Sequence, residues 1–200
     1  MRICSLGRLK VYVLLVYLDV KDKERNKYIC ENLDLMIRDL DNQMPVIVMG
    51  DFNGHVGFLG NQDKNHNGVK LLEFVERWNL IIMNCDIKCG GTYTRIERDN
   101  KSVIDYILVN EAMYKHYDSM EIDEDKLLYD LLDHVYIYVN LIIPNGKPKF
   151  KNRKVEKIKY YIIIILESAV QGWERVRTLY QSKDPNPTQP THGRKKNIKQ

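Results

Sequence analysis

The stretch Val46-Ile47-Val48-Met49-Gly50-Asp51-Phe52-Asn53-Gly54 carries the strongest structural signal in this chain. Four consecutive apolar residues that end at a glycine predict a strand that is buried on both faces. Side chains two positions apart in a strand point the same way, so Asp51 and Asn53 are expected to project together from its carboxyl end. A carboxylate can hold a metal ion or a water, and a carboxamide can donate to an anionic oxygen. The same residues favour a simple turn, and this stretch alone leaves both interpretations open.

Further regular elements flank this stretch. Residues 9–20 are apolar on both alternating faces, which predicts a central strand. Residues 21–41 carry apolar side chains at helical spacing, and Pro45 prevents that helix from continuing. Residues 55–67 are rich in glycine and asparagine, which predicts a loop that leads to a second helix over residues 69–79.

Short strands dominate the part of the chain that follows. Strands are expected at residues 80–84, 92–95, 102–109, 114–123 and 134–143, with a hairpin turn at 97–101. Strands outnumber helices, and hairpins mix with strand–helix–strand crossovers. We therefore expect an α/β fold of the α+β sandwich type, built on a mixed β-sheet with helices on one face.

Charge divides the chain into two parts. The 200 residues carry a net charge of +4, but residues 1–143 carry −6 and residues 144–200 carry +10. We interpret residues 1–143 as one domain and residues 144–200 as a basic tail, with a helix over residues 155–180 and a disordered end over residues 181–200. A basic tail is consistent with a nucleic-acid partner, and a solvated extension explains the same composition.

Composition argues against membrane and secreted classes. The apolar run Tyr161–Leu166 in the tail is too short to span a bilayer, and charged residues lie on both sides of it. The four cysteines form no disulfide framework, and Cys85 and Cys89 lack a second Cys/His pair for a zinc site. We expect an intracellular protein with reduced thiols and no membrane contact, for which the nucleus is one compatible location.

Two further polar features lie beside predicted strands. Asp105 interrupts the apolar run Ile104–Leu108, where a carboxylate is costly unless it has a partner. Asp133 and His134 stand directly before the last predicted strand, and a carboxylate that orients an imidazole is a recurring catalytic arrangement. Asp105 and His134 can be partners if their strands are neighbours. The alternatives are a cross-strand hydrogen bond for Asp105 and a capped strand end for the Asp133-His134 pair.

The order of these signals is itself informative. It runs through Gly50–Asn53, Asn67-Gly68, Leu71–Phe74, Asn84, Gly91–Thr94, Ser102–Val109 and Asp133-His134. This order resembles the C-terminal half of the endonuclease/exonuclease/phosphatase family, which has the deoxyribonuclease I-like fold, over residues 8–143. The chain is most similar to the endonucleases of LINE-type retrotransposons and to craniofacial development protein 2-like proteins. The resemblance implies one half of a four-layer sandwich.

The resemblance also implies a reaction, the Mg²⁺-assisted hydrolysis of a phosphodiester, with DNA as substrate or ligand. Asp51 would orient or deprotonate the attacking water, and Asn53 would bind the phosphate. His134 would stabilise the charge that develops on the phosphate oxygens, and Asp105 would orient its imidazole. Tyr17 falls where the family has a tyrosine that touches the phosphate.

The metal site is where the chain departs from the family pattern. The resemblance implies that Asp51 and Asp133 lie at a site for Mg²⁺, or for Mn²⁺ in its place. The family also has an early asparagine and a metal-binding glutamate ahead of the strand that residues 9–20 resemble, and the eight residues before that strand contain neither. Leu132 replaces the serine that usually precedes the Asp-His pair. We therefore expect a truncated, weakly active or inactive enzyme with weakened metal binding.

Three functions stay open on this reading. They are a DNA endonuclease, a catalytically dead remnant of one, and a nucleic-acid-binding adaptor that acts through the basic tail. A single sheet of the sandwich would leave one apolar face bare, with Ile47 and Met49 among the candidates for it. We expect the tail or a protein partner to cover that face.

Overall fold

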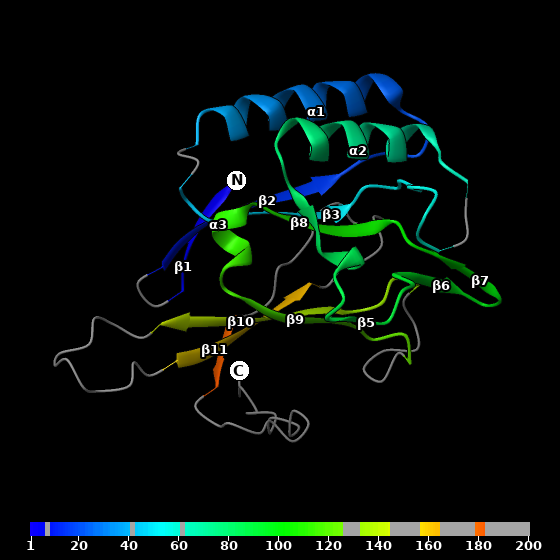
Figure 1. Ribbon diagram of the computed structural model, residues 1–200. Helices are drawn as coiled ribbons and strands as arrows, with labels where there is room; N and C mark the ends of the chain where they lie inside the picture. Colours follow the sequence, from blue (N-terminus) through cyan, green and yellow to red (C-terminus); the bar gives the residue numbers. More distant parts are fainter. Residues whose placement is uncertain are drawn as a thin grey trace, which may run out of the picture.

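The computed structural model describes residues 1–6, 9–40, 43–60, 63–125 and 133–144, together with the backbone of residues 157–164 and 179–182. These residues form three layers: a pair of helices and two β-sheets that pack face to face (Figure 1). Apart from residues 181–182, the predicted disordered end lies outside the described residues.

The first sheet is mixed, as the sequence predicts. Its strands, in spatial order, are β1 (Arg2–Leu6), β2 (Leu9–Tyr17), β3 (Val46–Asp51), β8 (Asp105–Val109) and β4 (Ile81–Ile82). β2 and β3 run parallel, and the other neighbours are antiparallel. All six residues of β3 are buried, which confirms the prediction of a strand covered on both faces.

Two helices cover one face of this sheet (Figure 1). α1 spans Lys23–Arg38 and α2 spans His66–Arg77. Each begins at a side chain that accepts a backbone N–H, Asp22 for α1 and Asn65 for α2. The apolar sides of the helices pack on the sheet through Leu33, Ile37, Leu71 and Phe74, which contact the cluster that contains Leu14, Val48 and Leu108. The prediction of helices on one face is confirmed.

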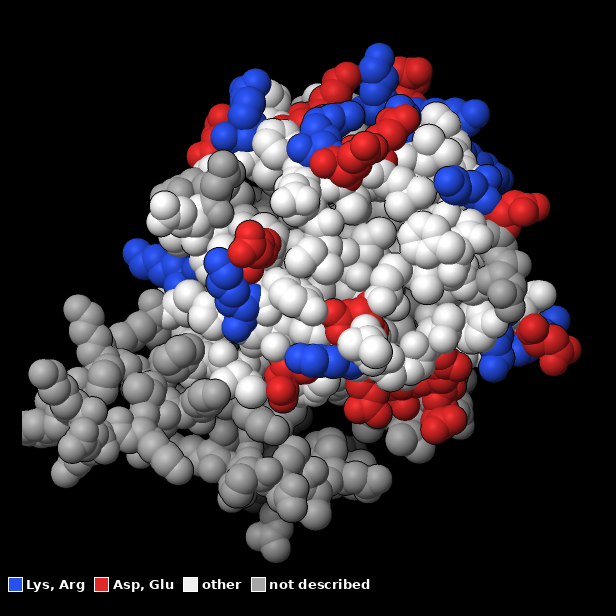
Figure 2. Space-filling view, viewed as in Figure 1, with Lys and Arg blue, Asp and Glu red and all other residues white. Residues whose placement is uncertain are grey.

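The outer side of the helical layer carries charges of both signs (Figure 2). Lys70 pairs with Glu73 at 2.8 Å within α2, and Arg77 of α2 pairs with Asp34 of α1 at 2.5 Å. Exposed ion pairs contribute little stability, so the apolar contacts beneath hold the helices in place. Among the described residues, no helix is both long and apolar enough to cross a membrane.

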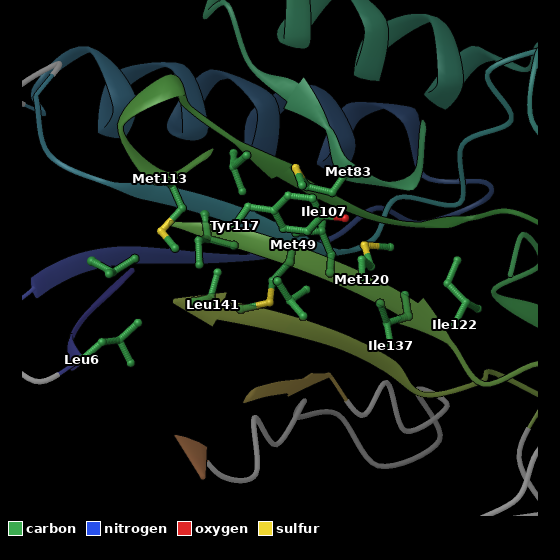
Figure 3. Packing of buried hydrophobic residues seen from close by; sticks show 14 of the residues in the cluster. Leu6, Met49, Met83, Ile107, Met113, Tyr117, Met120, Ile122, Ile137 and Leu141 are labelled. Carbon is green, nitrogen blue, oxygen red and sulfur yellow. The ribbon is translucent and has the colours of Figure 1, made fainter. Parts of the chain in front are cut away.

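A second sheet packs against the other face of the first. Its strands, in spatial order, are β12 (Leu179–Ser182), β11 (Lys157–Ile164), β10 (Ile137–Pro144), β9 (Tyr117–Ile122) and β5 (Cys89–Gly90). The core between the sheets is rich in methionine and includes Met49, Met83, Met113, Met120, Ile107, Ile137 and Leu141 (Figure 3). The connecting elements are the 3₁₀ helix η1 (Met83–Cys85), the hairpin β6 (Arg95–Glu97) and β7 (Asn100–Ser102), and α3 (Glu111–Tyr114).

The predicted bare face is wrong. Ile47 and Met49 lie in the core between the two sheets, so the chain itself covers the face that was expected to need the tail or a partner. Alternation identifies residues 117–122 and 137–144 as strands, but it does not say which sheet a strand joins. These strands form β9 and β10 of the second sheet instead of extending the first.

The predicted helix over residues 155–180 is also wrong. Residues 157–164 form β11, which pairs antiparallel with β10, and residues 179–182 form β12. The run Ile158–Ile164 is rich in β-branched and aromatic residues, which favour strands because their side chains lose rotamer freedom in a helix. The other residues of the predicted helix lie outside the described part of the chain.

Tyr117 is a testable weak point of the inter-sheet core. Its hydroxyl is buried and has no hydrogen-bond partner among the described residues, and burial raises its pKa. A buried donor without a partner costs stability, so Tyr117→Phe should raise the free energy of unfolding by about 1 kcal/mol in urea titrations. The matched control is Tyr106→Phe, because the buried Tyr106 hydroxyl donates to the carbonyls of Gly54 or Val103, at 2.8 and 3.0 Å. That control should be destabilised, and equal losses in both variants would contradict the prediction.

Candidate active site

Two carboxylates face each other across neighbouring strands. Asp51 continues the row formed by Ile47 and Met49 on the inter-sheet face of β3, and the antiparallel register places it opposite Asp105 of β8. Asp51 is 7% exposed and Asp105 is 1% exposed. Like charges directly opposite each other in a sheet repel, and burial adds a desolvation cost. The pair therefore requires cationic or hydrogen-bonding partners.

His134, in the segment that leads into the second sheet, supplies one such partner. It precedes β10, and its Nδ1 lies 3.1 and 3.0 Å from the two carboxylate oxygens of Asp105. A backbone bridge to Arg95 and the hydrogen bond from Val135 N–H to the Thr94 carbonyl, at 2.9 Å, hold this segment against the β6 region. The predicted partnership of Asp105 and His134 is thus present. With Asp51 they form a cluster whose ligand atoms all lie within 4.8 Å of one another.

Two buried side chains fix Asp105, and no sequence pattern assigned a role to either of them. Thr94 is fully buried, and its Oγ1 accepts hydrogen bonds from the backbone N–H groups of Ile104 and Asp105, each at 3.0 Å. Asn84 donates to the Asp105 carbonyl at 3.0 Å and accepts from the Ile107 N–H at 3.1 Å. Both residues occur in the stretches that carry the family resemblance, but a lone Thr or Asn has no signal that identifies its partner.

Asn53 holds the carboxylate of Asp51. Its backbone adopts a left-handed conformation with φ of 45°, which asparagine tolerates better than most residues. In this conformation its N–H donates to Asp51 Oδ1 at 2.8 Å, and its Nδ2 donates to Asp51 Oδ2 at 3.1 Å and to the Leu18 carbonyl at 2.8 Å. Asn65 Nδ2 donates to the Asn53 carbonyl at 2.9 Å. The turn therefore positions the Asp51 carboxylate, and the turn interpretation of this stretch does not exclude a functional site.

Gly50 lets the site-bearing strand approach β2. A Cβ atom added at Gly50 would lie 1.9 Å from the Val16 carbonyl oxygen, and Gly50 has φ of 145°. Only glycine fits this combination of close approach and backbone conformation. The glycine that ends the apolar run is thus required by strand packing, one residue before Asp51.

The other two predicted site residues take different places. Tyr17, at the end of β2, is the parallel partner of Asp51 and lies on the same face of the sheet. Asp133 forms an ion pair with Arg95, with Oδ2 and Nε 3.0 Å apart, and Arg95 also binds Glu97. Burial raises the pKa of Asp133, but the hydrogen bond and the charges of Arg95 and His134 outweigh this effect and lower it. Asp133 is not in the cluster of Asp51, Asp105 and His134.

Burial and charge act in opposite senses on His134. Burial lowers the pKa of its imidazole, but the hydrogen bond and charge of Asp105, with the charges of Asp51 and Asp133, outweigh burial and raise it. Burial raises the pKa of Asp105 against the influence of His134 and Thr94. Because the folded-state pKa of His134 is raised, its protonated imidazole stabilises the fold, and that contribution is lost as pH rises through the folded-state pKa of His134.

The titration of His134 can be measured directly. In the native chain its imidazole should titrate above about 6.5, the ordinary pKa of histidine. In Asp105→Asn its pKa should fall, because the hydrogen bond and charge that raise it most are removed. Asp133→Asn is the matched control and should lower the pKa by less, since Asp133 makes a smaller contribution. Histidine NMR titration tests this, and equal pKa values in the two variants would contradict the geometry.

Comparison with known proteins places this arrangement in a family. No curated protein matches the chain. A family model described as endonuclease-reverse transcriptase matches residues 11–138. Among solved structures, the endonuclease domain of TRAS1, a telomere-specific non-LTR retrotransposon, is 22% identical with a TM-score of 0.47, over 64% of this chain and 54% of that one.

Two bacterial structures resemble this chain with comparable sequence identity and TM-score. The 3′ phosphatase NExo from Neisseria, bound to product DNA hairpin, is 18% identical with a TM-score of 0.49, over 65% of this chain and 59% of that one. An endonuclease/exonuclease/phosphatase family protein from Leptotrichia buccalis is 17% identical with a TM-score of 0.49, over 68% and 51%. The chain thus spans between half and three fifths of the length of these structures. The match of the family model to most of the two-sheet body shows that the chain belongs to the endonuclease/exonuclease/phosphatase family.

Proposed function

We propose that this chain is a divalent-cation-dependent phosphodiester hydrolase that acts on DNA as an endonuclease. The convergence of Asp51, Asp105 and His134 at the edge where the two sheets meet carries the proposal. Membership of the family, whose matching model is described as endonuclease-reverse transcriptase, supports it. We propose Mg²⁺ as the cation, with Mn²⁺ able to replace it.

His134 and Asp105 act as a unit in this proposal. Asp105 engages Nδ1 of the imidazole at both carboxylate oxygens, so Nε2 is the nitrogen that can reach the substrate. The raised pKa of His134 favours the imidazolium, which can donate a hydrogen bond to a phosphate oxygen as negative charge develops there. Asp105 keeps the ring in one orientation, in the way that a buried carboxylate orients a catalytic histidine.

Asp51 and Asn53 act on the nucleophile side. Asp51 orients the attacking water or accepts its proton, while Tyr17 contacts the phosphate. Asn53 can contact the phosphate only if its Nδ2, which donates to Asp51 Oδ2 and to the Leu18 carbonyl, leaves one of these acceptors. A bound Mg²⁺ would supply charge neutralisation at the phosphate and lower the pKa of a bound water. Such an ion accepts one or two carboxylates and completes its shell with water and phosphate oxygens, and the oxygens of Asp51 suit it. Asp133 can serve as a second ligand only if its carboxylate leaves Arg95.

A weakly active or inactive chain is the alternative, and one observation favours it. Asp105 is engaged by His134 and Asp133 by Arg95, so each of these two carboxylates already has a cationic partner that competes with a metal ion. A nucleic-acid-binding adaptor stays a second alternative, because the basic tail has 14 Lys and Arg against 4 Asp and Glu over residues 144–200. A nuclear location belongs to the endonuclease proposal.

Plasmid cleavage tests the catalytic proposal. The full chain should nick supercoiled plasmid in the presence of Mg²⁺, and His134→Ala should lower the rate by about 10²-fold or more, because charge stabilisation at the phosphate is lost. His66→Ala, which removes an exposed imidazole from α2, is the matched control and should cleave at the native rate. Cleavage that is equal in all three proteins, or absent from the native chain, would contradict the proposed activity.

Cation binding separates the two predicted ligands. Mg²⁺ should raise the midpoint of thermal unfolding of the native chain, since a ligand that binds only the folded state stabilises it. Asp51→Asn should abolish this increase, and Asp133→Asn should keep most of it, because Asp133 is held by Arg95. Thermal unfolding with Mg²⁺ and with EDTA measures both effects. If Mg²⁺ fails to raise the unfolding midpoint of Asp133→Asn but still raises that of Asp51→Asn, the ion binds at Asp133 instead.

A further inference from the structure

Two buried asparagines lie where both helices begin, beside the end of β2. Asn26 is in the first turn of α1 and is 5% exposed, and Asn67 is in the first turn of α2 and is 6% exposed. A buried carboxamide is costly unless its donors and acceptor are bonded. Neither residue touches the reacting groups, so its hydrogen bonds must explain its burial.

The hydrogen bonds of this pair converge on Asp19, just beyond β2. Asn26 Oδ1 accepts from the Asp19 N–H at 2.8 Å, and Asn26 Nδ2 donates to the Asp19 carbonyl at 2.6 Å. Asn67 Nδ2 donates to the same carbonyl at 3.1 Å, and Asn67 Oδ1 accepts from Asn26 Nδ2 at 3.1 Å. The two carboxamides and the Asp19 backbone therefore form a closed, buried network.

This network reaches the candidate active site through a single peptide group. The N–H of Asp19 and the carbonyl of Leu18 belong to the same planar peptide. Asn26 accepts from its N–H end at 2.8 Å, and Asn53 Nδ2 donates to its carbonyl end at 2.8 Å. Because the peptide is planar, fixing the direction of the N–H also fixes the direction of the carbonyl that Asn53 uses. Hydrogen bonding at one end of a peptide also strengthens the acceptor at the other end.

Asn53 depends on that carbonyl for its orientation. Its Nδ2 has two acceptors, the Leu18 carbonyl and Asp51 Oδ2, and the second is the longer bond at 3.1 Å. If the Leu18 carbonyl turned away, the carboxamide would lose the acceptor outside the Asp51 turn and could rotate. The Leu18 N–H is also bonded to the Asp51 carbonyl at 2.9 Å, so the same residue contacts both site residues.

We propose that Asn26, braced by Asn67, is a positioning residue that sets the Asn53 carboxamide through the Leu18-Asp19 peptide. The proposal rests on the role of Asn53 in the proposed function, but the positioning itself is a property of the folded chain. The helices α1 and α2 thereby help to position Asn53, since each contributes a buried asparagine from its first turn. Asn26 acts directly on the peptide and Asn67 acts through Asn26 and the Asp19 carbonyl, so the two substitutions should differ in size.

The experiment is NMR hydrogen exchange of the Asn53 side-chain NH₂ in the full, ¹⁵N-labelled chain. The signal is assigned by its loss in Asn53→Asp. Asn26→Ala should speed this exchange by about tenfold, because the anchored acceptor is released, and Asn67→Ala by a smaller factor. Asn110→Ala is the matched control, since Asn110 accepts from Val46 and Met113 N–H groups at 3.0 Å and donates to the Met44 carbonyl at the other end of β3. It should leave the Asn53 exchange rate within about twofold of the native rate.

The outcomes separate this proposal from the proposed activity. Thermal unfolding by circular dichroism checks that each variant is folded, and Asn67→Ala carries the test if Asn26→Ala does not fold. An Asn53 exchange rate equal to that of Asn110→Ala in the folded variants would overturn the positioning role. If the native chain cleaves plasmid, Asn26→Ala should lower kcat with little change in KM, and a loss confined to KM would also overturn it. If the native chain does not cleave, the activity is refuted and the exchange rates still decide the positioning.

Discussion

Asp51 and Asp105 face each other on neighbouring strands in a region with little access to water, and the site is organised around this repulsion. Two carboxylates at such positions favour ionisation only if donors or cations gather around them. The chain brings His134 to Asp105 from the segment before β10 and the Asn53 turn to Asp51 from the end of β3. The need to compensate these charges therefore couples the strand register, the contact between the sheets and the local turn.

This coupling explains why the site lies at an edge of the sandwich. Farther along β3 and β8, the same inter-sheet face carries Ile47, Met49 and Ile107, which pack into the apolar core. At the carboxyl end of β3 the row changes from apolar to charged, and His134 precedes β10 at the corresponding end of the second sheet. The apolar core fixes the distance between the two sheets. That distance allows the His134 imidazole to reach the Asp105 carboxylate. A loss of packing near Met49 would therefore shift His134 relative to Asp105.

Part of the fold could be predicted from the sequence. The buried strand at residues 46–51, the first helix and the alternating strands follow from local periodicity, which needs no partner to be recognised. The order of Asp51, Asp105 and His134 predicted the cluster that they form, since a charged residue in an apolar strand is costly and therefore informative. The bare sheet face was wrong because it depended on which strand pairs with which. The tail helix was wrong because the β-branched and aromatic residues of Ile158–Ile164 favour a strand, which pairs with β10. The roles of Thr94 and Asn26 could not be predicted, because the role of a single polar residue depends on its hydrogen-bond partner, which the sequence does not identify.

The sequence by itself determined which residues form β3 and the turn after it, because an apolar run ended by glycine, aspartate and asparagine allows few local structures. It also determined that Asp105 needs a partner. Only the tertiary structure decided that this partner is His134, that Asp133 turns to Arg95, and that β9 and β10 form a second sheet. These contacts join residues that are far apart in the chain. Their pairing depends on the register of strands and the packing of layers, which local periodicity does not encode.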